Sequence, residues 1–79
     1  MSEVALVEIR AEDVQKVLDH LAAEHFVVAQ YELLGRYNLG VIIEVKDKQL
    51  LFDVVISNIR KIPGVQETRT HLIQDGVVL

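Results

Sequence analysis

Two apolar runs joined by a short polar segment constrain the fold of this chain more than any other feature. Residues 27–34 and 39–45 are rich in Val, Ile, Leu and Tyr, and Gly35-Arg36-Tyr37-Asn38 connects them. β-branched and aromatic residues favour strands, while Gly and Asn accept the positive φ angles of tight turns. Because the connection is so short, the two strands are predicted to pair antiparallel as a hairpin.

Helical patterns lie on either side of this hairpin. The acidic pair Glu12-Asp13 precedes an amphipathic stripe from Val14 to His25, in which His25 is expected to be a half-buried residue at the helix end. Asp47 is a candidate N-cap for a second helix that runs to about Ile62 and stops at Pro63-Gly64. The apolar positions of this second helix are too widely spread for contact with one sheet alone.

Strand patterns near both ends complete the order β-α-β-β-α-β. Residues 4–10 are apolar on both faces for most of their length, and residues 65–73 are more polar and contain Thr68 and Thr70. We therefore predict a single domain over residues 1–79, of the α+β class. Its expected architecture is ferredoxin-like, a four-stranded antiparallel sheet with two helices on one face. The apolar tail Val77-Val78-Leu79 is expected to pack on another part of the protein.

The small size of the chain suggests self-association. It has 79 residues and no cysteine, and a domain of this size buries only roughly 60% of its unfolded surface. The sheet face without helices must still carry apolar residues, because Val41, Ile42 and Ile43 point alternately to both sides. We predict a dimer or higher oligomer joined through the sheet faces.

Charge and composition exclude several classes of function. The formal net charge is −4 and the basic residues are scattered, whereas nucleic-acid binders usually carry a basic face. No segment has the pattern of a secretory signal or the roughly 20 apolar residues of a membrane span. We expect a cytoplasmic protein that binds neither DNA nor membranes directly.

Catalytic and metal-binding patterns are absent from the sequence. Ser57 lacks the context of a nucleophile, the carboxylates are dispersed, and His71 has no recognisable orienting group. No enzyme activity, metal or cofactor is therefore predicted. Recognition chemistry concentrates at the hairpin tip, Gly35 to Asn38, with Thr68 and Thr70 as further candidates. The simpler interpretation, a plain turn and a strand with good β propensity, fits the same residues.

Several segments together resemble one known family. They are Tyr31-Glu32-Leu33-Leu34-Gly35-Arg36-Tyr37-Asn38-Leu39, Val41 to Val45, Ile59-Arg60-Lys61-Ile62-Pro63-Gly64-Val65 and Thr68-Arg69-Thr70. This combination resembles the effector-binding (RAM) domain of the Lrp/AsnC transcriptional regulators, over residues 3–73. The resemblance implies dimers joined sheet to sheet, often rings of dimers, and small effectors, commonly amino acids, bound between dimers.

The resemblance also implies which residues contact the effector. The hairpin motif of the family falls on Gly35, Tyr37 and Asn38, and its threonine motif on Thr68 and Thr70; Arg36 lies within the hairpin motif. The family usually has aspartate where Asn38 stands, and an amide forms no charge-assisted bond to an ammonium group. Family members also carry a helix-turn-helix domain that this chain lacks, which suggests a stand-alone effector domain.

The leading hypothesis is thus an oligomeric amino-acid-sensing domain that acts as a regulator or as a partner of full-length Lrp/AsnC proteins. An assembling interaction module without effector is the alternative, and the amide at Asn38 favours it. A small ferredoxin-like enzyme ranks lower. An ACT-type amino-acid-binding domain also ranks lower, because the junction Arg10-Ala11-Glu12 lacks the glycine expected after the first strand.

Overall fold

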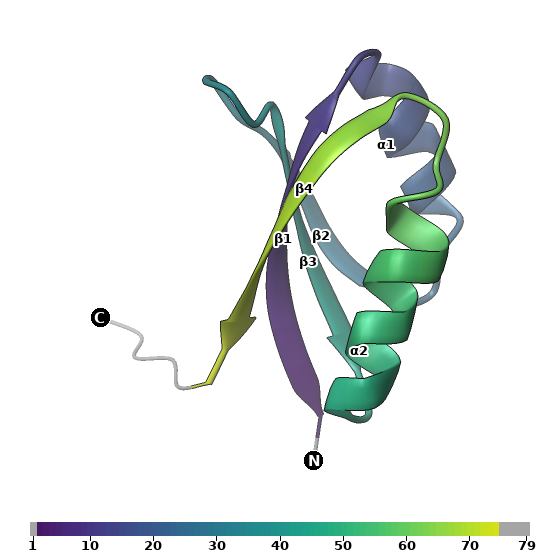
Figure 1. The fold of residues 1–79 in the computed structure, drawn as a ribbon, viewed down its shortest axis with the longest axis vertical. Helices are drawn as coiled ribbons and strands as arrows, with labels where there is room; N and C mark the ends of the chain where they lie inside the picture. Colours follow the sequence, from purple (N-terminus) through teal and green to yellow (C-terminus); the bar gives the residue numbers. More distant parts are fainter. Residues whose placement is uncertain (1, 75–79) are drawn as a thin grey trace.

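The computed structural model describes residues 2–74, so the tail Val77-Val78-Leu79 lies outside the described residues. The elements are β1 (Glu3–Ala11), α1 (Val14–Ala22), β2 (Val27–Glu32), β3 (Leu39–Val45), α2 (Lys48–Val54), the π-helical turn η1 (Val55–Ile59) and β4 (Val65–Ile73). The strands form one antiparallel sheet in the order β2-β3-β1-β4 (Figure 1). The predicted α+β, ferredoxin-like βαββαβ fold is confirmed.

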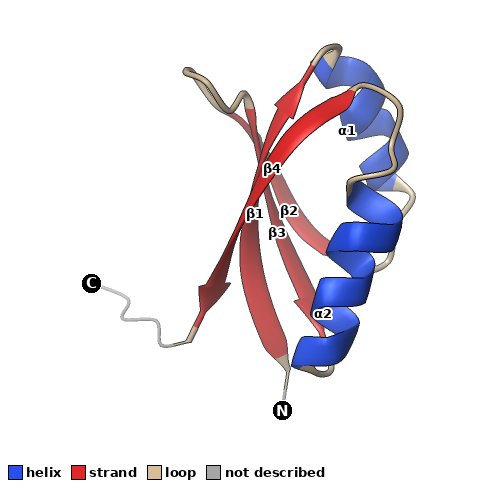
Figure 2. Ribbon diagram, viewed as in Figure 1, coloured by secondary structure: helices blue, strands red, loops and turns tan. Residues whose placement is uncertain are grey.

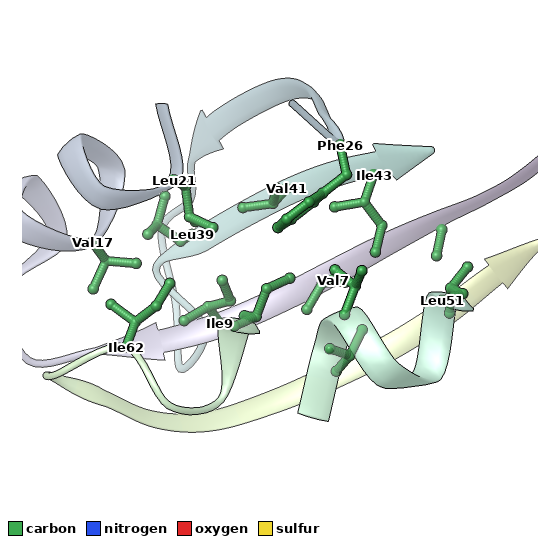
Figure 3. Close-up of a cluster of buried hydrophobic side chains, with 14 of the residues drawn as sticks. Val7, Ile9, Val17, Leu21, Phe26, Leu39, Val41, Ile43, Leu51 and Ile62 are labelled. Atoms are coloured by element: carbon green, nitrogen blue, oxygen red, sulfur yellow. The ribbon is translucent and has the colours of Figure 1, made fainter. Parts of the chain in front are cut away.

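Both helices cover the same face of the sheet (Figure 2). The apolar core fills the space between these two layers, and Figure 3 shows side chains from strands and helices meeting there. Ile9 on β1, one of the two inner strands, and Leu21 on α1 are both fully buried. No buried polar or charged residue interrupts this core among the described residues.

The first helix ends earlier than predicted. The backbone N–H of the C-cap residue Ala23 bonds to the carbonyls of His20 and Leu21, and the chain then turns away. His25 is exposed, so its prediction as a half-buried helix-end residue was wrong, and Phe26 is the buried residue at this corner. Helical spacing alone did not show that the chain leaves the helix before residue 25.

The second helix begins as predicted, since the Asp47 side chain accepts a hydrogen bond from the Leu50 N–H at 2.8 Å. It continues into the π-helical turn η1, whose wider loop is closed by the Arg60 N–H and the Val55 carbonyl at 2.9 Å. Its apolar residues face both ways: Val55 is buried, whereas Phe52 and Ile56 are 56% and 52% exposed. The apolar residues of this helix therefore extend beyond the side that faces the sheet, as predicted.

The face of the sheet that no helix covers is called the open face below. Along β1, Ala5, Val7, Ile9 and Ala11 are buried against the helices, so Val4, Leu6, Glu8 and Arg10 point to the open face. Strand register sets Ile42 and Ile73 beside the apolar pair and Arg69 and Glu67 beside the charged pair. His71 lies opposite Leu6, and its side chain reaches Glu8. The open face thus has an apolar end and a charged end.

Candidate functional site

The hairpin between β2 and β3 ends in a loop closed by the Leu33 N–H and the Asn38 carbonyl at 3.0 Å. Gly35 has a φ of 136°, which glycine adopts more readily than residues with a side chain. Asn38 does not have a positive φ, so Gly35 is the residue of this turn that uses the left-handed region. The tip projects from the sheet on the side away from the helices (Figure 1).

Asn38 ties the base of this loop to the end of β1. Its side-chain Oδ1 accepts a hydrogen bond from the Ala11 N–H at 2.8 Å, and its Nδ2 donates one to the Ala11 carbonyl at 2.9 Å. Its backbone N–H donates to the Ile9 carbonyl at 3.0 Å. The side-chain amide of Asn38 therefore bonds the Ala11 N–H and carbonyl as the backbone of a further β3 residue would. An aspartate here would place a carboxylate oxygen against the Ala11 carbonyl oxygen.

Tyr37 and Arg36 reach the far edge strand instead. The Tyr37 hydroxyl donates to Glu67 Oε2 at 2.6 Å, and Arg36 donates from Nη2 to Oε1 at 2.9 Å and from Nε to Oε2 at 3.3 Å. Because β1 lies between β3 and β4, Tyr37 crosses over β1 to make this contact. The Arg69 guanidinium carbon lies 5.1 Å from the centre of the Tyr37 ring, within the range of a cation–π contact.

The contacts among Arg36, Tyr37 and Glu67 favour the ionised forms of Arg36 and Glu67. The hydrogen bonds from Tyr37 and Arg36, with the nearby positive charges of Arg36 and Arg10, lower the pKa of Glu67 below its ordinary value. The same carboxylate raises the pKa of Arg36, chiefly through the hydrogen bond. Glu67 is thus a carboxylate at neutral pH and holds the tip in place by charge-assisted bonds.

Thr68 and Thr70 lie on the opposite face of β4 from Glu67. They pair with Ile9 and Val7, whose side chains are buried under the helices. Thr68 is half-buried and Thr70 is exposed at the sheet edge. The structure therefore brings Arg36 and Tyr37 together with Glu67, and it places the two threonines on the other side of the same strand.

Sequence reasoning missed Glu67, Arg10 and Arg69 as neighbours of the hairpin tip. It also missed the partner of His71, whose Nε2 lies 2.7 Å from Glu8 Oε1 on the open face. Alternation along the fourth strand already separated Glu67, Arg69 and His71 from the threonines. The register against β1, which sets Glu67 beside Arg10, was the information that the sequence lacked.

A hollow of about 500 Å³ lies between the start of α1 and the turn before β4. It is lined by Glu12, Asp13, Lys16, Pro63 and Gly64, none of which was predicted as a site residue. Within residues 2–74, no group of three His, Asp or Glu side chains gathers as a candidate metal site. Over the same residues, neither helix has the length and apolar character needed to cross a membrane.

Residues 3–78 match the Lrp/AsnC ligand binding domain, so the fold, the hairpin and the fourth strand together define a regulatory ligand-binding domain. The chain belongs to the Lrp/AsnC ligand-binding family. The predicted resemblance is confirmed. No curated protein sequence matches the chain significantly.

Solved structures of similar fold include both short and long proteins. TTHA0845 from Thermus thermophilus is 29% identical, with a TM-score of 0.82; the match covers 98% of this chain and 99% of that one. E. coli AsnC is 19% identical, with a TM-score of 0.87, covering 98% of this chain and 54% of that one. The complex of the Neisseria meningitidis transcriptional regulator NMB0573 with L-Met is 11% identical, with a TM-score of 0.89, and coverage is 98% and 53%. The chain thus spans about half the length of these two regulators.

Proposed function

We propose that this protein is an oligomeric amino-acid-sensing domain that regulates transcription together with family partners. The observation that carries the proposal is the match of residues 3–78 to the ligand-binding domain of the Lrp/AsnC family. The similar fold of NMB0573, which was solved with L-Met, supports an amino acid as the effector. The effector meets the hairpin tip and the Thr68–Thr70 segment where a second dimer completes the pocket.

The open face supports the dimer. Leu6 pairs with Ile42 across β1 and β3, and a side chain at Gly40 would come within 3.2 Å of Leu33 and 3.6 Å of Leu6. Leu6, Leu33 and Ile42 thus form an apolar patch on the open face, which association would hide. We expect light scattering at micromolar concentration to give at least a dimer, and Ile42→Asp to give a monomer. A monomeric mass for the unchanged protein would contradict this proposal.

The anchored tip supports the effector site. Asn38 fixes the loop to β1 and Glu67 fixes it to β4, so the backbone near Gly35 is preorganised for a ligand without an ordering cost at this point. Calorimetric titration of the assembled protein with the twenty amino acids tests this function. Heat with at least one of them is expected, and Thr70→Val should weaken it.

Ser57→Ala is a matched control, because it also removes one exposed hydroxyl but lies on η1. It should leave the titration unchanged. No heat with any amino acid, in a sample shown to be the assembled oligomer, would contradict sensing.

A second candidate function is an interaction module without effector. The bonds of Asn38 favour it, because both polar groups of this side chain are used by the Ala11 backbone. Such a module would still assemble through the open face, and would bind the matching face of a full-length regulator. Mixed oligomers without any amino-acid heat would support this candidate over sensing.

A further inference from the structure

A histidine contacts a carboxylate on the open face. The Nε2 of His71 on β4 lies 2.7 Å from Oε1 of Glu8 on β1, and the two side chains are 47% and 25% exposed. An imidazole ordinarily changes its charge at about pH 6.5. The contact therefore has two forms: an ion pair in weak acid, and a carboxylate beside a neutral imidazole at higher pH.

His71 and Glu8 lie where the apolar end of the open face meets the charged end. The register partner of His71 is Leu6, which pairs in turn with Ile42 on β3. The register partner of Glu8 on β3 is Gly40, which has no side chain to shield the carboxylate on that side. A second copy that covers Leu6 and Ile42 in the proposed dimer would therefore also cover this contact and exclude water from it.

The other charges of the open face do not replace His71 as the partner of Glu8. Arg69 is the register partner of Glu8, but its guanidinium lies against the Tyr37 ring. Within residues 2–74, the ion pairs are those of Arg36 with Glu67 and of His71 with Glu8. Further titratable side chains on this face are Arg10, Tyr31 and Glu44. The charge that compensates Glu8 by direct contact is thus the proton on His71.

Covering Glu8 with a second copy affects the two forms of the contact differently. A carboxylate removed from water is costly unless a paired charge lies against it. The protonated imidazole supplies that charge, whereas the neutral imidazole supplies a hydrogen bond and leaves the negative charge uncompensated. Association through the open face therefore favours the form with the proton on His71, and proton binding in turn favours association.

We propose that the contact between His71 and Glu8 is a pH-sensitive switch of assembly, with tighter association through the open face in weak acid. This inference rests on the proposed oligomeric function and adds a regulation to it. Each copy carries one such contact, so a symmetric dimer takes up as many as two protons. An effector pocket that only the assembled protein completes would then form more fully as the pH falls.

Sedimentation at several protein concentrations, from about pH 5.5 to about pH 8 at fixed salt, tests the switch. The dissociation constant of the unchanged protein should be about tenfold lower, or more, at the acidic limit. His71→Gln should abolish most of this change, because glutamine keeps a donor without a titrating charge. Glu8→Gln should also abolish it, and should associate more tightly than the unchanged protein at the upper pH, since no carboxylate is then covered.

His20→Gln is the matched control, because His20 is an exposed histidine on α1, and it should keep the pH dependence of the unchanged protein. If the protein stays assembled at every dilution, the urea midpoint at the same pH values replaces the dissociation constant, since association raises it. Association that does not tighten in acid, or that tightens equally in His71→Gln, would overturn the switch and leave sensing intact. A monomeric mass at every pH would overturn both the switch and the proposed dimer.

Discussion

The two faces of the sheet are built from the same strands and differ in how they are completed. On the helix-covered face, Val7 and Ile9 are fully buried within the chain itself. On the open face, Leu6 and Ile42 remain half-buried, and the charged end holds the ion pair between Arg36 and Glu67. One face is therefore completed by folding of the chain itself, and the other is the face that the proposed dimer would cover.

The largest expected effect is a loss of stability, and it distinguishes the two faces of the sheet by two substitutions on the same strand, β1. Ile9→Ala should lower the free energy of unfolding by about 3 kcal/mol at any protein concentration, because it leaves a cavity in the core. Leu6→Ala on the open face should cost about 1 kcal/mol in dilute solution and more where the protein associates. Urea unfolding at two protein concentrations measures both. Equal losses for both variants, independent of concentration, would mean that the two faces do not differ in this way.

The strand-level fold was predictable because its signals are local. Alternation along residues 65–73 and the Asp47 cap needed no distant partner, and both agree with β4 and α2. The alternation of Val41, Ile42 and Ile43 likewise predicted an apolar residue on each face, which register confirmed.

The contacts of the hairpin tip were not predictable in the same way. The bond between Tyr37 and Glu67 joins residues 30 positions apart, and it depends on the order of three strands. Asn38 fits a turn by composition, yet its side chain acts as a ladder partner of Ala11. A residue type that suits a local role gives no sign of a distant one. Effector contacts at Gly35, Arg36, Tyr37, Asn38, Thr68 and Thr70 stay predictions.

An intermediate loss of stability is expected where the hairpin tip is bound to β1. Asn38→Asp should lower the free energy of unfolding by about 2 kcal/mol at neutral pH, because it removes the donor to the Ala11 carbonyl and sets two oxygens against each other. Thermal unfolding monitored by circular dichroism measures this loss. Asn58→Asp, on the exposed side of η1, is the control and should have little effect. An unchanged melting temperature for Asn38→Asp would show that the amide does not act as a ladder partner.

The smallest expected effect concerns the charged end of the open face, and it appears in the pH dependence. The pKa of Glu67 is lowered in the folded protein, so its ion pair contributes stability above the ordinary pKa of glutamate. That contribution is lost as the pH falls through the lowered folded pKa. Glu67→Gln should therefore be less stable than the unchanged protein at neutral pH, and the two unfolding curves should converge in acid.

Glu32→Gln separates this effect from general loss of a carboxylate, because Glu32 is an exposed glutamate at the end of β2. Its difference from the unchanged protein should be small and nearly independent of pH. Urea unfolding from neutral to acidic pH at fixed salt measures all three proteins. A constant difference for Glu67→Gln across this range would mean that hydrogen-bond geometry, rather than charge, holds the tip against β4. Convergence would instead show that the negative charge of Glu67 holds the tip against β4.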